Sequence, residues 1–125
     1  MKDKNKLLSR QALEIVAARF RALSDASRLQ ILQYLFKKEH SVQEICELSG
    51  MSQANVSKHL SVLAEQGIVQ KRRQGLFVYY SIADSTIYEL CDIVCGSVGK
   101  RYSQVTKEFS GRWAKQDLNL VSLYS

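Results

Sequence analysis

The sequence predicts a mainly α-helical domain with one small β-hairpin. Apolar residues recur every three or four positions in most segments before residue 66 and again after residue 86, which is the period of an amphipathic helix. Residues 68–82 differ, because they are rich in β-branched and aromatic residues around a single glycine. Proline is absent, as suits a helical chain with few rigid turns. We expect one domain over residues 1–108, followed by a tail, residues 109–125, whose structure the sequence leaves undecided.

Two helices are expected first. The apolar stripe of the first, over residues 9–23, is Leu13, Val16, Ala17, Phe20 and Leu23. Ser24 or Asp25 then caps a second helix over residues 26–38. The side that this second helix buries is expected to be Leu29, Leu32, Leu35 and Phe36.

Two shorter helices follow, separated by a tight turn. Ser41, with Glu44 three residues later, forms a capping box for the first of them, and Gly50 ends it. Ser52 caps the next helix and Gly67 ends it. The inner stripe of that helix is Val56, Leu60 and Leu63. Two helices joined in this way are a helix-turn-helix, whose second helix reads the major groove of DNA.

A basic hairpin comes directly after these helices. We expect two strands within residues 68–82, around a turn at residues 73–75. The basic cluster Lys71, Arg72 and Arg73 lies at the strand end and tip. A hairpin in this position is the wing of a winged helix-turn-helix, which is therefore the fold that the sequence predicts.

A last long helix is expected from about Thr86, capped by Asp84 or Ser85, to about residue 108. Its apolar side is Ile87, Leu90, Cys91, Val94 and Val98. Gly96 weakens this helix by about 1 kcal/mol relative to alanine.

The net charge of +6 favours a polyanionic partner, most often nucleic acid. Glutamine and asparagine can pair with adenine edges, and lysine suits phosphate or guanine. We expect contacts to double-stranded DNA from Ser52, Gln53, Asn55, Ser57, Lys58 and His59 on the helix and from Lys71, Arg72 and Arg73 on the wing. The alternative is a solvated polar helix face and a solvated hairpin tip, in a winged-helix module that binds a protein rather than bases.

The stretches "LSDASRLQILQYL", "MSQANVSKHLSVLAEQGIV" and "RRQGLFVYY" resemble the ArsR/SmtB family of winged-helix repressors, over about residues 12–100. The resemblance implies a homodimer built by the first and last helices, which blocks an operator with dyad symmetry until an inducer releases it. By position it implies major-groove contacts from Gln53, Ser57 and His59 and wing contacts from Arg72, Arg73 and Gln74. Asp25 and Arg28 match the family's D-x-x-R, for which we expect a structural role or a phosphate contact.

Two inducer sites of the family are not expected here. Its arsenite and cadmium box "ELCVCDL" is absent, because Ser41 and Gln43 occupy the two cysteine positions. Its zinc site needs histidines on the last helix, whereas the two histidines of this chain, His40 and His59, lie elsewhere. Cys46 is interpreted as a small hydrophobic residue that packs inward.

Cys91 and Cys95 are the candidate inducer-sensing pair. At a spacing of four on one helix, their Cβ atoms lie about 5–6 Å apart, which exceeds the roughly 3.5–4.5 Å of a disulfide. Two such thiolates could chelate arsenite or a soft metal ion such as Cu(I), with a third ligand from the other protomer, or form a persulfide or polysulfide bridge. The alternative is two small residues packed in a dimer interface, and the nearby acids Glu89 and Asp92 would raise a thiol pKa.

Several other classes are not expected. No run of about 18 apolar residues could span a membrane. The charged start of the chain lacks the apolar core of a secretory signal, and three cysteines without such a signal favour the cytoplasm. No Gly-rich phosphate loop, zinc-hydrolase motif or nucleophile–base pair indicates an enzyme.

Overall fold

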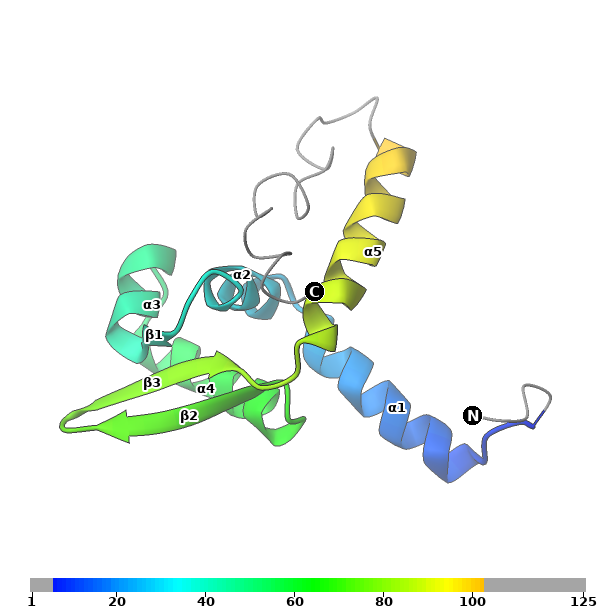
Figure 1. Ribbon diagram of the computed structural model, residues 1–125, viewed down its shortest axis with the longest axis horizontal. Coiled ribbons are helices and arrows are strands. Elements are labelled where there is room, and N and C mark those ends of the chain that lie inside the picture. Colours follow the sequence, from blue (N-terminus) through cyan, green and yellow to red (C-terminus); the bar gives the residue numbers. More distant parts are fainter. Residues whose placement is uncertain (1–5, 103–125) are drawn as a thin grey trace.

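The computed structural model describes residues 6–102, which form five helices and a three-stranded antiparallel sheet (Figure 1). In chain order the elements are α1 (Arg10–Leu23), α2 (Ala26–Leu35), β1 (His40–Ser41), α3 (Val42–Ser49), α4 (Gln53–Glu65), β2 (Val69–Gln74), β3 (Phe77–Ile82) and α5 (Thr86–Tyr102). This order confirms the predicted winged helix-turn-helix. Residues 103–108 of the predicted last helix and the tail, residues 109–125, lie outside the described residues.

The helix ends follow the capping chemistry of the sequence. Asp25 caps α2 by accepting a hydrogen bond from the backbone N–H of Arg28. Ser41 and Glu44 form the predicted reciprocal capping box of α3. Gly50 ends α3 at a φ of 78°, a left-handed conformation that glycine adopts without a Cβ penalty. These local signals fix where the helix-turn-helix begins and turns.

The core lies between α2, α3, α4 and the sheet. Its fully buried side chains include Ile31, Leu32, Ile45, Val56, Leu60, Leu63 and Ile68. The first turns of α5 join this core through Ile87, Tyr88 and Cys91. The Tyr88 ring meets Phe36 edge to face, with ring centroids 5.1 Å apart. The root of α5 is therefore fixed to the helix-turn-helix body.

The hairpin turn lies further along the chain than predicted. Strands β2 and β3 stay paired as far as Gln74 and Phe77, so Arg73 is inside the ladder, opposite Val78. The turn is the residue pair Gly75 and Leu76, with a φ of 61° at Gly75. A two-residue hairpin loop favours glycine at such a position. The predicted turn at residues 73–75 was therefore wrong.

The sheet and two helices differ from prediction in smaller ways. Strand β1, which pairs His40 with Tyr80, was not predicted. Helix α2 ends at Leu35 rather than at residue 38, and Leu29 on it is 37% exposed rather than buried. On α5, Val94 is also exposed. Leu29 and Val94 thus face away from the core of this single chain.

Helices α1 and α5 extend from the helix-turn-helix body in two different directions, and the hairpin extends on the opposite side (Figure 1). The apolar stripe of α1 is largely uncovered, with Phe20 55% exposed and Leu13 50% exposed. The middle of α5 exposes Ile93 and Val94 in the same way. Both helices thus carry apolar side chains that this single chain does not bury.

Candidate DNA interface

Helix α4 presents a polar face because its apolar residues point inward. Val56, Leu60 and Leu63 are fully buried, which turns the intervening positions outward. Among the predicted DNA contacts on this helix, the exposed ones are Ser52, Gln53, Asn55 and Lys58. Ser57 and His59 are half-buried. The Ser52 hydroxyl accepts a hydrogen bond from the Asn55 backbone, so this side chain also serves as the helix cap.

The four residues of the wing that we expect to contact DNA lie on two opposite faces of β2. Successive side chains of a strand alternate, so Lys71 and Arg73 share one face of β2, and Arg72 and Gln74 share the other. Lys71 pairs with Tyr80, which is buried, so the face of Lys71 and Arg73 is the one that turns toward the helices. These two cations lie on the same side of the sheet as the core and α4.

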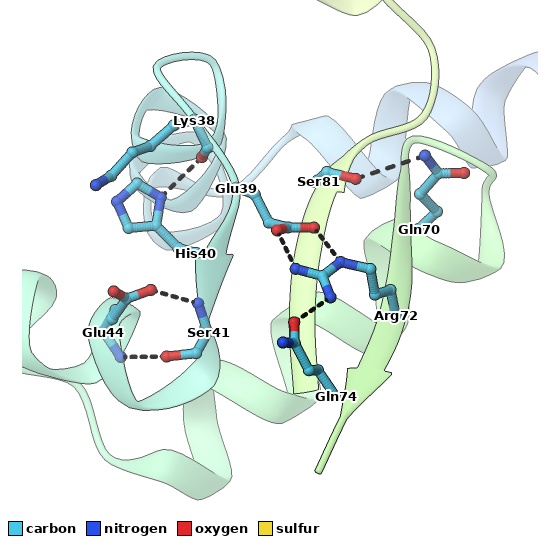
Figure 2. A network of polar contacts seen from close by, with 9 residues as sticks. All are labelled: Lys38, Glu39, His40, Ser41, Glu44, Gln70, Arg72, Gln74 and Ser81. Atoms are coloured by element: carbon cyan, nitrogen blue, oxygen red, sulfur yellow. Dashed lines mark hydrogen bonds and ion pairs between the residues drawn. The ribbon is translucent and has the colours of Figure 1, made fainter. Parts of the chain in front are cut away.

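Arg72 is held by an acceptor network within the domain (Figure 2). Its guanidinium donates to both carboxylate oxygens of Glu39, from Nε at 3.0 Å and from Nη2 at 2.6 Å. Its Nη1 donates to Oε1 of Gln74 at 2.5 Å, and its guanidinium carbon lies 4.9 Å from the centre of the Tyr79 ring. The hydrogen bond from Arg72 lowers the pKa of Glu39 below its usual value. Two of the four predicted wing contacts are therefore engaged with one another, and the charge of Arg72 is paired.

Asp25 and Arg28 have the structural role that was one of the two expected. The backbone N–H of Arg28 is the main cause that lowers the pKa of Asp25. The Arg28 side chain donates to the carbonyl oxygens of Ala22 and Arg21, at the end of α1. Its Nη1 lies 3.2 Å from Nδ1 of His59 on α4.

A second arginine joins three elements near the root of α5. Arg19 of α1 donates to the carbonyl of Gln66, at the end of α4, at 2.8 Å. It also forms an ion pair of 2.5 Å with Asp84, just before α5. Sequence reasoning missed this contact because it joins residues that are far apart in the chain.

The candidate thiol pair spans the edge of the core. Cys91 is only 8% exposed, Cys95 one turn further along α5 is half-buried, and both are free. Burial, with a smaller contribution from the charge of Cys95, raises the pKa of Cys91 to about 11. Cys46 is half-buried and packs against the core. Within residues 6–102, no group of three or more histidine, cysteine or acidic side chains is placed to hold a metal ion.

An apolar pocket lies where α1, the end of α4 and α5 meet. It is lined by Ile15, Val16, Arg19, Phe20, Leu23, Gln66 and Leu90. The exposed apolar residues of α1 thus continue into a hollow beside α5.

In the part of the chain that the structure describes, no helix is long and apolar enough to cross a membrane.

A capped helix-turn-helix with a polar outer face and a basic wing defines a winged helix-turn-helix of the DNA-binding kind. Residues 25–71 match the family described as "Bacterial regulatory protein, arsR family". The chain is also 38% identical over 85 residues to the transcriptional regulator NmtR of Mycobacterium tuberculosis, a match that covers 68% of this chain and 71% of NmtR. The chain belongs to the arsR family. This is a family of regulatory proteins, which agrees with the expectation that the chain is not an enzyme.

Two further similarities bear on function. The chain is 42% identical over 71 residues to a "probable mercury resistance operon repressor" of Streptomyces lividans, covering 57% of each chain. The homodimeric winged helix-turn-helix DNA-binding domain Mb0332 of Mycobacterium bovis superposes with a TM-score of 0.66 at 32% identity, over 80% of this chain and 93% of that domain. The chain spans less than two thirds of several curated relatives that it matches.

Proposed function

We propose that this protein is a homodimeric, sequence-specific transcriptional repressor that acts in the cytoplasm on a double-stranded DNA operator with dyad symmetry. The observation that carries this proposal is the exposed polar face of α4 on the same side of the sheet as Lys71 and Arg73, in a chain of net charge +6. Base-edge contacts from Gln53 and Asn55 and phosphate contacts from the lysines would suit such an operator.

The homodimer is supported by the uncovered apolar faces of α1 and α5. Ile15 is 67% exposed and Ile93 is 68% exposed in the single chain, and burying such side chains is favourable. The apolar pocket beside Arg19 lies between these helices. A homodimeric neighbour of the same fold, Mb0332, supports the same arrangement.

The DNA-reading role is tested on Gln53, whose side chain is exposed at the first residue of α4. Gln53→Ala should weaken binding to a DNA site selected from a random duplex pool by about 1–3 kcal/mol, because a glutamine can pair bidentately with an adenine. Binding to unselected DNA should hardly change. An equal loss on both DNAs would show that Gln53 does not read bases.

The inducer of this repressor is, in our proposal, a soft ion bound by Cys91 and Cys95. A soft cation such as mercuric ion or Cu(I), or arsenite, prefers thiolate ligands and displaces their protons on binding. The name of the Streptomyces relative supports this class. A persulfide or polysulfide bridge also starts from a thiolate, so the raised pKa of Cys91 opposes both chemistries and does not choose between them. An ion that binds the DNA-free dimer more tightly would shift the population away from DNA.

A second candidate keeps the DNA-binding function but makes the cysteines structural. It is favoured by the position of Cys91 within the hydrophobic core. A DNA-release assay on the Cys91→Ala/Cys95→Ala double variant distinguishes the two, with Cys46→Ala as the matched control. Release of wild type and Cys46→Ala by mercuric ion, Cu(I) or arsenite, but not of the double variant, supports thiol sensing. Equal release of all three proteins would favour the structural role, and release by polysulfide alone would favour the sulfur chemistry.

A further inference from the structure

Arg28 connects the start of α2 to the recognition helix α4. Its Nε donates to the carbonyl of Ala22 at 2.6 Å, and its Nη2 donates to the carbonyl of Arg21 at 3.2 Å. The guanidinium is thus anchored on the last carbonyls of α1. From this anchored position, its Nη1 lies 3.2 Å from Nδ1 of His59.

The chemistry of the two groups decides where the proton of His59 lies. A guanidinium only donates hydrogen bonds, so Nδ1 of His59 must accept. In a neutral imidazole, an accepting Nδ1 requires the proton on Nε2. Within residues 6–102, Nε2 of His59 has no hydrogen-bond partner of its own. The ring therefore carries one N–H donor that no other group of residues 6–102 accepts.

We propose that Arg28 fixes His59 in the Nε2–H tautomer, so that α4 presents this N–H to an acceptor on the base edge of DNA. Suitable acceptors in the major groove are N7 of a purine and O6 of guanine. Arg28 is then a positioning residue of the recognition helix rather than a DNA contact. Oδ1 of Asp25 accepts from the Arg28 backbone, and within residues 6–102 its carboxylate forms no ion pair with the guanidinium. The DNA half of this inference rests on the proposed function, whereas the tautomer does not.

The other histidine, His40, is an internal control, because its hydrogen bond requires the opposite tautomer. Nδ1 of His40 lies 2.8 Å from the carbonyl oxygen of Lys38, as drawn in Figure 2. A carbonyl only accepts, so His40 must carry its proton on Nδ1. The chain has two histidines, so one molecule should show both tautomers.

The tautomers are measured by ring nitrogen–proton correlation NMR on the full-length ¹⁵N-labelled protein. The spectra are recorded at mildly alkaline pH, which favours the neutral imidazole whose two tautomers the measurement distinguishes. The signals of His59 are those that His59→Gln removes. We expect Nε2–H for His59 and Nδ1–H for His40. An Nδ1–H pattern at His59 would overturn the proposal.

Arg28→Met tests whether Arg28 is the cause. In this variant the two ring nitrogen shifts of His59 should move toward each other, as for a ring that exchanges between tautomers, while those of His40 stay. Unchanged His59 shifts in the folded variant would refute the role of Arg28. If Arg28→Met does not fold, Arg28→Lys replaces it, and displaced nitrogen shifts at His59 alone are again the expected result.

The DNA half is tested with two amide variants of His59. The amide of glutamine reaches the place of Nε2 and can still donate, whereas that of asparagine reaches only the place of Nδ1. On the DNA site selected by wild type, His59→Asn should lose about tenfold in affinity relative to random duplex, the scale of one hydrogen bond. His59→Gln should keep most of that preference.

Equal losses in both variants, or a loss that is the same on random DNA, would show that Nε2 does not read a base edge. An equal loss on random DNA would instead indicate a phosphate acceptor. If wild type itself shows no preference for any DNA, the proposed function fails, whereas the NMR measurement still decides the tautomer.

Discussion

Replacing Glu39 by a neutral side chain should leave the guanidinium of Arg72 free to contact a DNA phosphate. Glu39 holds this guanidinium through two hydrogen bonds, at 2.6 and 3.0 Å, so a phosphate would have to compete with a carboxylate that is already in place. Glu39→Gln removes the negative charge and keeps the size of the side chain. Arg72 then becomes an unpaired cation on a wing that we propose to lie on DNA.

The size of the effect follows from the cations of the candidate interface. Lys58, Lys71 and Arg73 are exposed and have no ion pair within residues 6–102. Two protomers would thus neutralise about six phosphates, and the slope of log affinity against log salt would be about −5. Adding Arg72 from each protomer of Glu39→Gln should steepen the slope to about −7.

The slope is measured by titrating a labelled duplex with protein at several salt concentrations, for wild type, Glu39→Gln and a control variant. Glu65→Gln is the matched control, since it removes an exposed carboxylate of α4 that does not bind Arg72. Glu65→Gln should tighten binding slightly at low salt, and its slope should stay near that of wild type rather than steepen by about two. If Glu39→Gln has the slope of the control, Arg72 is not a DNA cation and its predicted contact is wrong.

Leu60→Ala, at a fully buried position of α4, should lower the free energy of unfolding by about 2–5 kcal/mol in urea titrations. Leu48→Ala on the exposed side of α3 should cost much less, and similar losses in both would contradict the assigned core. Cys91 should make stability fall with alkaline pH, because the unfolded thiol ionises near its ordinary pKa of 9.0 while the folded thiol keeps its proton to about pH 11. Across that window the free energy of unfolding should fall by about 3 kcal/mol, and below pH 9 this contribution should be constant. Cys91→Ala should lack this part of the pH dependence and Cys46→Ala should retain it; identical alkaline curves would refute the buried thiol.

The fold was predictable because its helix ends depend on local chemistry. The capping box of Ser41 and Glu44 and the glycine end at Gly50 involve residues within one turn of each other, so their spacing predicts the structure directly. The hairpin was predictable for the same reason, although its turn was misplaced. A glycine with positive φ can take either central position of a tight turn, so Gly75 alone does not fix the register.

The contacts that shape the candidate site were not predictable in this way. Arg72 and Glu39 are 33 positions apart, and Arg28 and His59 are 31 apart. Both pairs depend on tertiary packing, which no periodicity or capping pattern records. The sequence therefore predicted which residues would lie on the wing and on α4, but not which of them would be bound by neighbours. The two-residue strand β1 was missed for the same reason, because it exists only through its pairing with β3.

Cys91 places a candidate ligand among the side chains that fill the core. An ion bonded to its sulfur would need space that close packing does not leave, so the atoms around it would have to give way. The root of α5 is seated by the same cluster, through Ile87 and Tyr88. Binding at this thiol would therefore displace α5 directly, with no intermediate element between the thiol and the helix. The same overlap limits redesign: a side chain chosen at this position for a different inducer would also have to fill the volume that holds α5 in place.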